Sequence, residues 1–226
     1  MKVLGVSGSP VHNGNTDRAL KKVLEATGLA TEFVSLKDCT VAPCRACLGC
    51  VDTHCCVIQD DGIVLAEKVK QADALVIAGF TPYSSLDSRT KAFMERLYPL
   101  RHNKGLLAGK PGGAVITCAI QANNEKMPPA FDFGSNAIKF FMMEEGMEFL
   151  GSVRVDGNVP CVKCGYGNAC AMSGITMLFG QDATVESVGI HAFEDQPAAV
   201  RAAVELGKSI AVSLRRGTRP MPITPA

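Results

Sequence analysis

Residues 2–16 read Lys-Val-Leu-Gly-Val-Ser-Gly-Ser-Pro-Val-His-Asn-Gly-Asn-Thr, and this stretch decides the fold. Residues 2–7 have the apolar character of a short buried strand in a parallel sheet. Residues 8–16 form a polar loop, and residues 16–27 carry apolar side chains at helical spacing. A strand, such a loop and a helix in this order bind phosphate, because free backbone N–H groups and the helix dipole face the anion.

The loop differs from two familiar phosphate loops. It lacks the Lys-Ser/Thr ending of a nucleoside-triphosphatase loop and the three glycines of the dinucleotide fingerprint. Hydroxyl groups without a lysine favour a permanently bound monoester phosphate, as in FMN. The alternative interpretation is an ordinary glycine-rich turn before a capped helix.

The rest of the chain continues the alternation of strands and helices. The apolar patterns predict further strands at 31–36, 74–80, 113–119 and 148–155, and helices at about 61–70, 87–98, 134–145 and 197–216. The Phe- and Met-rich stripe of 134–145 is interpreted as core, and Asp60 or Asp61 as a helix cap.

Five strands alternating with five helices predict an α/β fold, a doubly wound parallel sheet with strand order 2-1-3-4-5. Residues 1–216 form one domain with insertions at about 38–60 and 156–193. The tail, 217–226, is expected to be mobile or to lie over a neighbouring subunit. At the switch point of such a sheet, loop 8–16 and the loop at Pro82-Tyr83 meet at the C-terminal ends of their strands, where ligands bind.

Composition narrows the class of protein. The 226 residues are 47% apolar and 20% charged, with a formal net charge of +1, so neither nucleic acid nor an anionic membrane is an expected partner. The N-terminal apolar run is too short for a signal peptide, and nothing later approaches a membrane span. We therefore expect a cytoplasmic protein with reduced thiols, in which ten cysteines indicate metal binding or redox chemistry.

Six of the cysteines lie between residues 39 and 61. Cys44, Cys47 and Cys50 keep two-residue gaps, and Cys56 follows after five residues. This spacing favours an iron–sulfur cluster; zinc and free thiols are the alternatives. Cys56 is the preferred fourth ligand and Cys55 its rival. Because the stretch follows the second strand, its metal is expected beside the phosphate loop.

A second group consists of Cys161, Cys164 and Cys170. Its gaps of two and five residues suit a second cluster or a zinc site that borrows a fourth ligand. Cys118 is the first candidate for that ligand, and the weaker ones are Cys39 and His191. The alternative is a glycine-rich loop with incidental thiols. The four histidines form no pair with a carboxylate or a nucleophile, so no catalytic acid or base is expected.

Three motifs resemble one family. Residues 7–10 and 14–16 resemble the phosphate loop of the NADPH-dependent FMN reductase branch of flavodoxin-like proteins, and Pro82-Tyr83 with residues 89–96 resembles its second flavin loop and helix. The cysteines at 44, 47, 50 and 56, followed by Val57 and Asp60-Asp61, are similar to the compact motif of iron–sulfur flavoproteins. The resemblance covers about residues 1–155 and the final helix.

The resemblance implies FMN, a [4Fe–4S] cluster, a homodimer or homotetramer, and electron transfer as the activity. It places the FMN phosphate at Ser7, Ser9, Asn15 and Thr16, with Pro10, Asn13 and Gly14 of the same loop as further cofactor-binding residues. It places the flavin ring against Pro82, Tyr83, Ser84 and Ser85, with Thr117 on a third loop. Val11 stands where the family often has a basic residue, so phosphate affinity is expected to rest on backbone groups, hydroxyls and His12.

Three functions are compatible with these features. The leading hypothesis is a redox flavoprotein that transfers electrons between an iron–sulfur cluster and FMN, with a redox partner protein or a small molecule as donor or acceptor. The second is an NAD(P)H-dependent FMN or quinone reductase with structural or zinc-binding cysteines. The third is a non-enzymatic redox or metal sensor.

Overall fold

A computed structural model describes residues 1–217; the predicted tail, apart from Gly217, lies outside the described residues. One parallel sheet runs through the molecule in the order β2-β1-β3-β4-β5, which confirms the predicted topology. Its strands are β1 (Lys2–Ser7), β2 (Ala30–Ser35), β3 (Ala74–Phe80), β4 (Pro111–Cys118) and β5 (Glu148–Asp156).

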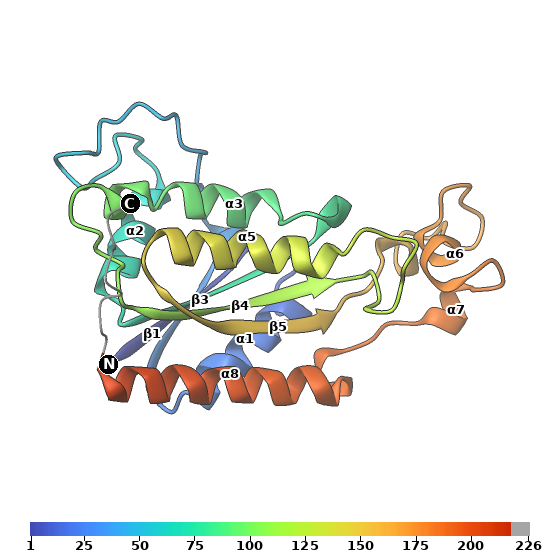
Figure 1. The fold of residues 1–226 in the computed structure, drawn as a ribbon. Helices are drawn as coiled ribbons and strands as arrows, with labels where there is room; N and C mark the ends of the chain where they lie inside the picture. Colours follow the sequence, from blue (N-terminus) through green and yellow to red (C-terminus); the bar gives the residue numbers. More distant parts are fainter. Residues whose placement is uncertain (218–226) are drawn as a thin grey trace.

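Helices cover both faces of the sheet (Figure 1). One face carries α1 (Asn15–Ala26) and α8 (Pro197–Arg216), and the other carries α2 (Asp61–Gln71), α3 (Ser88–Glu95) and α5 (Ala130–Glu144). Each helix layer packs its apolar side on its own buried cluster, because the strands are apolar on both faces. Among residues 1–217, no helix combines the length and the apolar character needed to cross a membrane.

One predicted helix is interrupted. The segment 87–98 is helical only as α3, and a short helix, α4 (Tyr98–Arg101), follows at once. Pro99 explains the break, because proline has no N–H to donate to the carbonyl of Glu95. Asp60 caps α2 as expected, since its side chain accepts from the Gly62 N–H.

The Phe- and Met-rich helix is less buried than predicted. Ile138 and Met142 are fully buried, but Phe133, Phe140 and Met143 are about half exposed. The interpretation of the stripe as core is therefore right for one side of α5 and wrong for the other.

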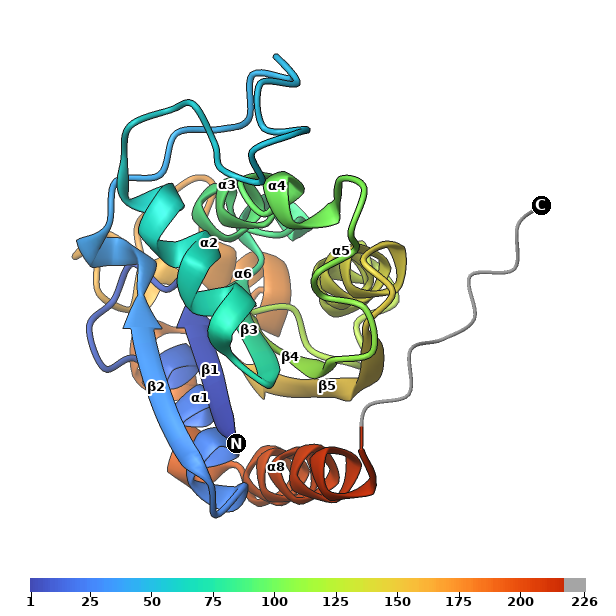
Figure 2. The same ribbon diagram turned by 90° about the vertical axis from the view of Figure 1, so that its left-hand side faces the viewer.

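Two cysteine-bearing segments lie outside the layers. Residues 39–60, called here the cysteine loop, contain neither helix nor strand and lie above α2, α3 and α4 (Figures 1 and 2). Residues 157–192, the distal segment, lie beyond the ends of β4 and β5 and contain α6 (Gly174–Phe179) and α7 (Val185–Val188). Short 3-10 turns occur at Leu36–Asp38, Pro82–Ser84, Pro160–Val162 and Phe193–Asp195.

A buried carboxyl group at the end of α5 makes stability depend on pH. Glu145 is 6% exposed, and its Oε2 has no hydrogen-bond partner among the described residues. Burial raises the pKa of Glu145 from 4.5 to about 7, against the attraction of Arg101, whose Nη1 lies 3.5 Å from Oε1. Since the folded-state pKa is raised, the stabilising contribution is complete below pH 4.5 and is lost as the pH rises through about 7.

We expect Glu145→Gln to remove this dependence, because the amide keeps the shape and carries no charge. Urea unfolding of the variant and the parent protein should give similar stabilities at about pH 4, well below the shifted pKa, and a gain of up to about 3 kcal/mol for the variant near pH 8. Glu144→Gln is the control, because the neighbouring Glu144 side chain is 69% exposed. An equal gain at both pH values would contradict the assignment.

Candidate functional site

Three loops meet at the C-terminal ends of β1, β3 and β4. The Gly8 N–H donates to the Ala78 carbonyl over 2.8 Å, and the Thr81 N–H donates to the Thr117 carbonyl over 3.1 Å. The hydroxyls of Thr16 and Thr117 are 2.8 Å apart. The structure therefore brings together the phosphate loop, the Pro82-Tyr83 loop and Thr117, the three parts of the flavin site predicted from the sequence.

The side chains of the phosphate loop mainly bond to the protein itself. The Ser7 hydroxyl is fully buried and donates to Asp17 over 2.6 Å, and the Asn13 N–H donates to the other Asp17 oxygen over 2.8 Å. The Ser9 hydroxyl donates to the Val11 carbonyl and accepts from the Val11 N–H. Most of these polar side chains thus hold the loop in shape, which leaves its main chain as the natural partner of an anion.

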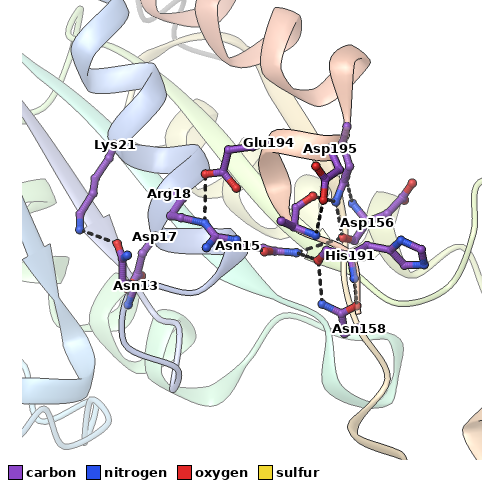
Figure 3. A network of polar contacts seen from close by, with 12 residues as sticks. Asn13, Asn15, Asp17, Arg18, Lys21, Asp156, Asn158, His191, Glu194 and Asp195 are labelled. Atoms are coloured by element: carbon purple, nitrogen blue, oxygen red, sulfur yellow. Dashed lines mark hydrogen bonds and ion pairs between the residues drawn. The ribbon is translucent and has the colours of Figure 1, made fainter. Parts of the chain in front are cut away.

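A polar network joins this loop to the distal segment (Figure 3). The Asn15 amide donates to the His191 carbonyl over 3.0 Å, and Asn158 both donates to that carbonyl and accepts from the His191 N–H. Arg18 donates to the Asn15 side-chain oxygen over 2.7 Å and pairs with Glu194. The end of the distal segment is consequently fixed beside the phosphate loop.

Positive charge also lies beside the loop. Lys21 donates to the Asn13 side-chain oxygen over 3.0 Å, one turn of α1 beyond Arg18. Both cations come from the helix, although Val11 takes the loop position where a basic residue was expected. His12 makes none of the side-chain hydrogen bonds described around the loop.

The second loop is held in an unusual backbone conformation. Tyr83 and Ser84 have positive φ angles of 49° and 60°, and the Tyr83 side chain is fully exposed. Left-handed geometry at such residues is costly and is typical of ligand-binding loops. Thr81, at the start of this loop, has a buried hydroxyl without a partner among the described residues. A polar edge of a flavin ring would satisfy it.

Asp87 attaches this second loop to the sheet. Its carboxylate accepts from the backbone N–H and the hydroxyl of Thr90 and from the Phe80 N–H. Burial raises the pKa of Asp87, and these hydrogen bonds act in the opposite direction. Gly8 packs directly on this arrangement, since a Cβ at Gly8 would lie 1.9 Å from Thr90 Oγ1 and 2.8 Å from Asp87 Oδ1. Only glycine fits there.

Four cysteines of the cysteine loop line one cavity of about 370 Å³. They are Cys44, Cys47, Cys50 and Cys56, and the other wall comes from the ends of α3 and α4. Cys55 is absent from this wall and lines a neighbouring cavity beside α2, which Cys56 also borders. The structure thus groups Cys56, rather than Cys55, with the three regularly spaced cysteines.

The thiols in this cavity influence one another. Burial raises the pKa of Cys50, and negative charge on the sulfurs of Cys56, Cys44 and Cys47 raises it further. The Ala46 N–H donates to Cys44 Sγ over 3.4 Å, and this contact favours a thiolate, in contrast to the raised pKa of Cys50. Within residues 1–217, no three Cys, His, Asp or Glu side chains converge closely enough to hold a metal ion. The sulfurs line the cavity without meeting at one point.

The position of this cavity corrects one expectation. The cysteine loop was predicted to lie beside the phosphate loop, but it turns back over the helices and meets the C-terminal end of α3. The N-terminal end of α3 lies at Asp87, next to the flavin loops. Figure 1 shows the cysteine loop and the distal segment toward opposite ends of the molecule. The cause is tertiary, because buried Arg96 holds the loop through Ala42 and Asp60.

The second cysteine group, like the first, has sulfurs that accept hydrogen bonds from backbone N–H groups. The Tyr166 N–H donates to Cys164 Sγ over 3.4 Å, and the Gly174 N–H donates to Cys161 Sγ over 3.3 Å. Cys164 and Cys170 are exposed, whereas Cys118 is buried and donates to the Ile120 carbonyl. Cys118 is thus engaged with its own loop.

The comparisons with known proteins agree with this geometry. The profile of the NADPH-dependent FMN reductase family matches residues 1–127, more than half of the chain. The chain belongs to the NADPH-dependent FMN reductase family. This matched range contains the phosphate loop, the Pro82-Tyr83 loop, Thr117 and the cysteine loop, but it ends before the distal segment.

Two curated relatives are named iron–sulfur flavoproteins. An iron–sulfur flavoprotein of Methanocaldococcus jannaschii is 37% identical over 122 residues, 53% of this chain and 63% of that protein. An iron–sulfur flavoprotein of Methanosarcina thermophila is 34% identical over 118 residues, 51% of this chain and 62% of that protein. The matches thus span less than two thirds of these relatives.

Solved structures extend the likeness in fold to nearly the whole chain. A structure described as an NADH:FMN oxidoreductase in its apo form has a TM-score of 0.58 at 12% identity and covers 99% of this chain and 96% of that one. RosB with a bound flavin-type intermediate has a TM-score of 0.62 at 14% identity, covering 97% and 82%. These values establish a flavodoxin-like fold for this member of the FMN reductase family.

Several residues that shape the family's site here were not found from the sequence. Asp17 and Asp87 organise the two flavin loops, and Arg96 holds the cysteine loop. Asp87 and Thr90 had a visible signal, because an aspartate three residues before a threonine is a helix N-cap pattern. Arg96 had none, because its partners are distant in the sequence.

Proposed function

We propose that this protein is an FMN-dependent oxidoreductase that transfers electrons between an iron–sulfur cluster and FMN. The observation that carries the proposal is the grouping of four thiols, Cys44, Cys47, Cys50 and Cys56, around one cavity in a chain of the FMN reductase family. Four thiolates are the usual ligand set of a [4Fe–4S] cluster. The names of the relatives support the same cofactor.

FMN would be held at the three loops described above. The main chain of residues 8–14 and the N-terminus of α1 would take the phosphate, with Ser9, Pro10 and Gly14 in the loop itself. Ser7, Asn13 and Asn15 would keep the loop in shape, because their side chains bond to other residues of the protein. The ring would lie against the second loop, and its residues there are Pro82, Tyr83, Ser84 and Ser85, with Thr16, Thr81 and Thr117 beside it.

Bound FMN would supply the conversion between two-electron and one-electron transfer. A redox partner protein that carries single electrons would provide two in succession through the cluster, and solvent would provide the two protons that complete FMN reduction. The reverse direction returns both electrons and both protons. The role of the chain is to hold the two groups.

The separation of the two sites within one chain favours an oligomer. The cysteine cavity and the flavin loops lie at opposite ends of α3, whose eight residues span about 12 Å. A homodimer or homotetramer would allow the cysteine loop of one subunit to face the flavin loops of another.

Anaerobic purification followed by flavin, iron and sulfide analysis tests the proposal. We expect one FMN and at least about four irons and four sulfides per chain, because four thiolates bind one [4Fe–4S] cluster. Absence of iron and sulfide from a protein that retains FMN would overturn the cluster, and absence of FMN would overturn the whole proposal.

The same measurement decides whether the second cysteine group binds metal. We propose a second site at Cys161, Cys164 and Cys170, with Cys118 as the candidate for the fourth ligand, on the basis of the N–H···S contacts to Cys161 and Cys164. It would add iron beyond one cluster, or zinc. A clean value of four irons and no zinc would contradict it.

One alternative keeps specific support. The family description and the loop geometry also suit an NAD(P)H-dependent FMN or quinone reductase in which the cysteines are structural. Rapid NADPH oxidation by a protein that contains FMN but neither iron nor sulfide would select this alternative.

A further inference from the structure

Arg96 is the most deeply buried cation described in the structure, and it faces the cysteine cavity. Its side chain is 1% exposed and pairs with Asp60 at 2.6 Å. Its Nη1 also donates to the Ala42 carbonyl over 3.0 Å, and its Nη2 donates to the Ile58 carbonyl over 3.2 Å. These contacts hold both limbs of the cysteine loop, and Arg96 lines the same cavity as the four thiols.

One N–H donor of this guanidinium has no acceptor among the described residues. Arg96 Nε is buried and has no hydrogen-bond partner among the described residues. An unsatisfied buried donor costs about 1–3 kcal/mol, and more when it is charged. Such a cost is normally avoided, so the unpaired N–H indicates a partner that the protein chain itself does not provide.

The lining of the cavity indicates the nature of that partner, because Arg96 lies in the same wall as the four thiols. His102 lines this cavity too, and its Nε2 is also buried without a partner among residues 1–217. Two side chains with an unpaired nitrogen therefore border the space enclosed by the thiols.

We propose that Arg96 is a positioning residue of the iron–sulfur cluster, whose buried guanidinium donates its Nε–H to a sulfur of the cluster and raises the reduction potential of the cluster. This inference rests on the proposed function, because it requires a cluster on the four cysteines. Hydrogen bonds to cluster sulfurs and nearby positive charge stabilise the reduced, more negative state. Arg96 is suited to this role because its other donors fix its orientation.

A redox titration of the cluster, followed by EPR, tests the effect of the residue. In Arg96→Lys, which retains a charge but not the three-point attachment, we expect the equilibrium constant for one-electron reduction to fall about tenfold, a shift of about 59 mV to lower potential. Lys91→Gln is the control, because it removes a positive charge from the same helix where the side chain is 58% exposed. A potential equal to that of the control, with full iron content, would overturn the proposal.

Two further measurements cover a variant that fails to fold or to load iron. The double variant Asp60→Asn with Arg96→Met removes the buried pair together, so no single charge is left unpaired, and its cluster should show the same lowered potential. In the unaltered protein with 15N-labelled arginine, pulsed EPR of the reduced cluster should detect a 15N coupling. That coupling should persist in Arg45→Gln, which removes the exposed arginine of the same wall. Its absence would overturn the proposal.

The outcomes separate this inference from the proposed function. A parent protein without iron and sulfide would remove the proposed cluster and the role of Arg96 together. A parent protein with a full cluster but no 15N coupling would remove the role of Arg96 alone.

Discussion

Replacing Cys47 with alanine is expected to abolish the iron–sulfur cluster while leaving FMN bound. Cys47 is the central member of the regularly spaced thiols, and all four candidate ligands line one cavity. A [4Fe–4S] cluster requires four ligands, so the iron content should fall by about four atoms per chain. FMN should remain, because its loops lie at the other end of α3 and do not depend on the cysteine loop for their hydrogen bonds.

The matched control for this experiment is Cys55→Ala. It makes the same chemical change in the same loop, but Cys55 lines the neighbouring cavity, and iron content should be retained. Cys56→Ala should behave like Cys47→Ala. Loss of both FMN and iron in the Cys47 variant would show instead that the loop supports the fold. Loss of iron in the Cys55 variant, with retention in the Cys56 variant, would reverse the assignment of the fourth ligand.

Gly8→Ala is expected to weaken FMN binding by about tenfold to a hundredfold. The added methyl group would lie 1.9 Å from Thr90 Oγ1, so the phosphate loop and the start of α3 must move apart. Overpacking costs about 1–3 kcal/mol, and about 1.4 kcal/mol corresponds to a tenfold change in affinity. Both flavin loops would shift together, because Asp87 holds the second loop through Phe80 and Thr90. Titration of the apoprotein with FMN, followed by fluorescence, measures the change.

Gly28→Ala is the control for a general loss of stability. Gly28 has a φ of +62° and open space around its Cβ position, so alanine there strains the backbone without entering the flavin site. Its cost of about 1 kcal/mol should leave FMN affinity nearly unchanged. Adding Thr90→Ala to Gly8→Ala removes the nearest clashing atom and should restore part of the affinity. Full affinity in Gly8→Ala would contradict the close contact between the loops.

The fold was largely predictable because its signals are local. Apolar runs identified all five strands to within about two residues at each end, and their alternation with helices led to the observed strand order. The failures have physical causes. Pro99 divided one helix, and the exposed half of α5 could not be recognised from composition, since apolar residues need not be buried.

The flavin loops were predictable in position but less so in detail. The sequence located two of the loops, because they follow β1 and β3. In the structure, the hydroxyl contact between Thr16 and Thr117 connects the third loop to the first. The hydrogen-bond partner of each loop residue could not be predicted from the sequence. The Ser7 hydroxyl and the Asn13 backbone N–H donate to Asp17, and the Asn15 amide donates to the distal segment, because each finds a partner that the folded chain brings near.

The sequence by itself determined the sheet, the phosphate loop after its first strand, and a set of cysteines spaced to hold a cluster. Each of these depends on residue types at short spacing. Tertiary structure alone decided where the cysteines lie and that Cys56, which borders both cavities, shares one of them with the other three, whereas Cys55 does not. The reason is that Arg96 reaches Asp60 and Ala42 across 36 and 54 residues of sequence. Contacts between residues so far apart in the sequence produce no periodic pattern that could be recognised in it. They nevertheless direct the cysteine loop away from the phosphate loop.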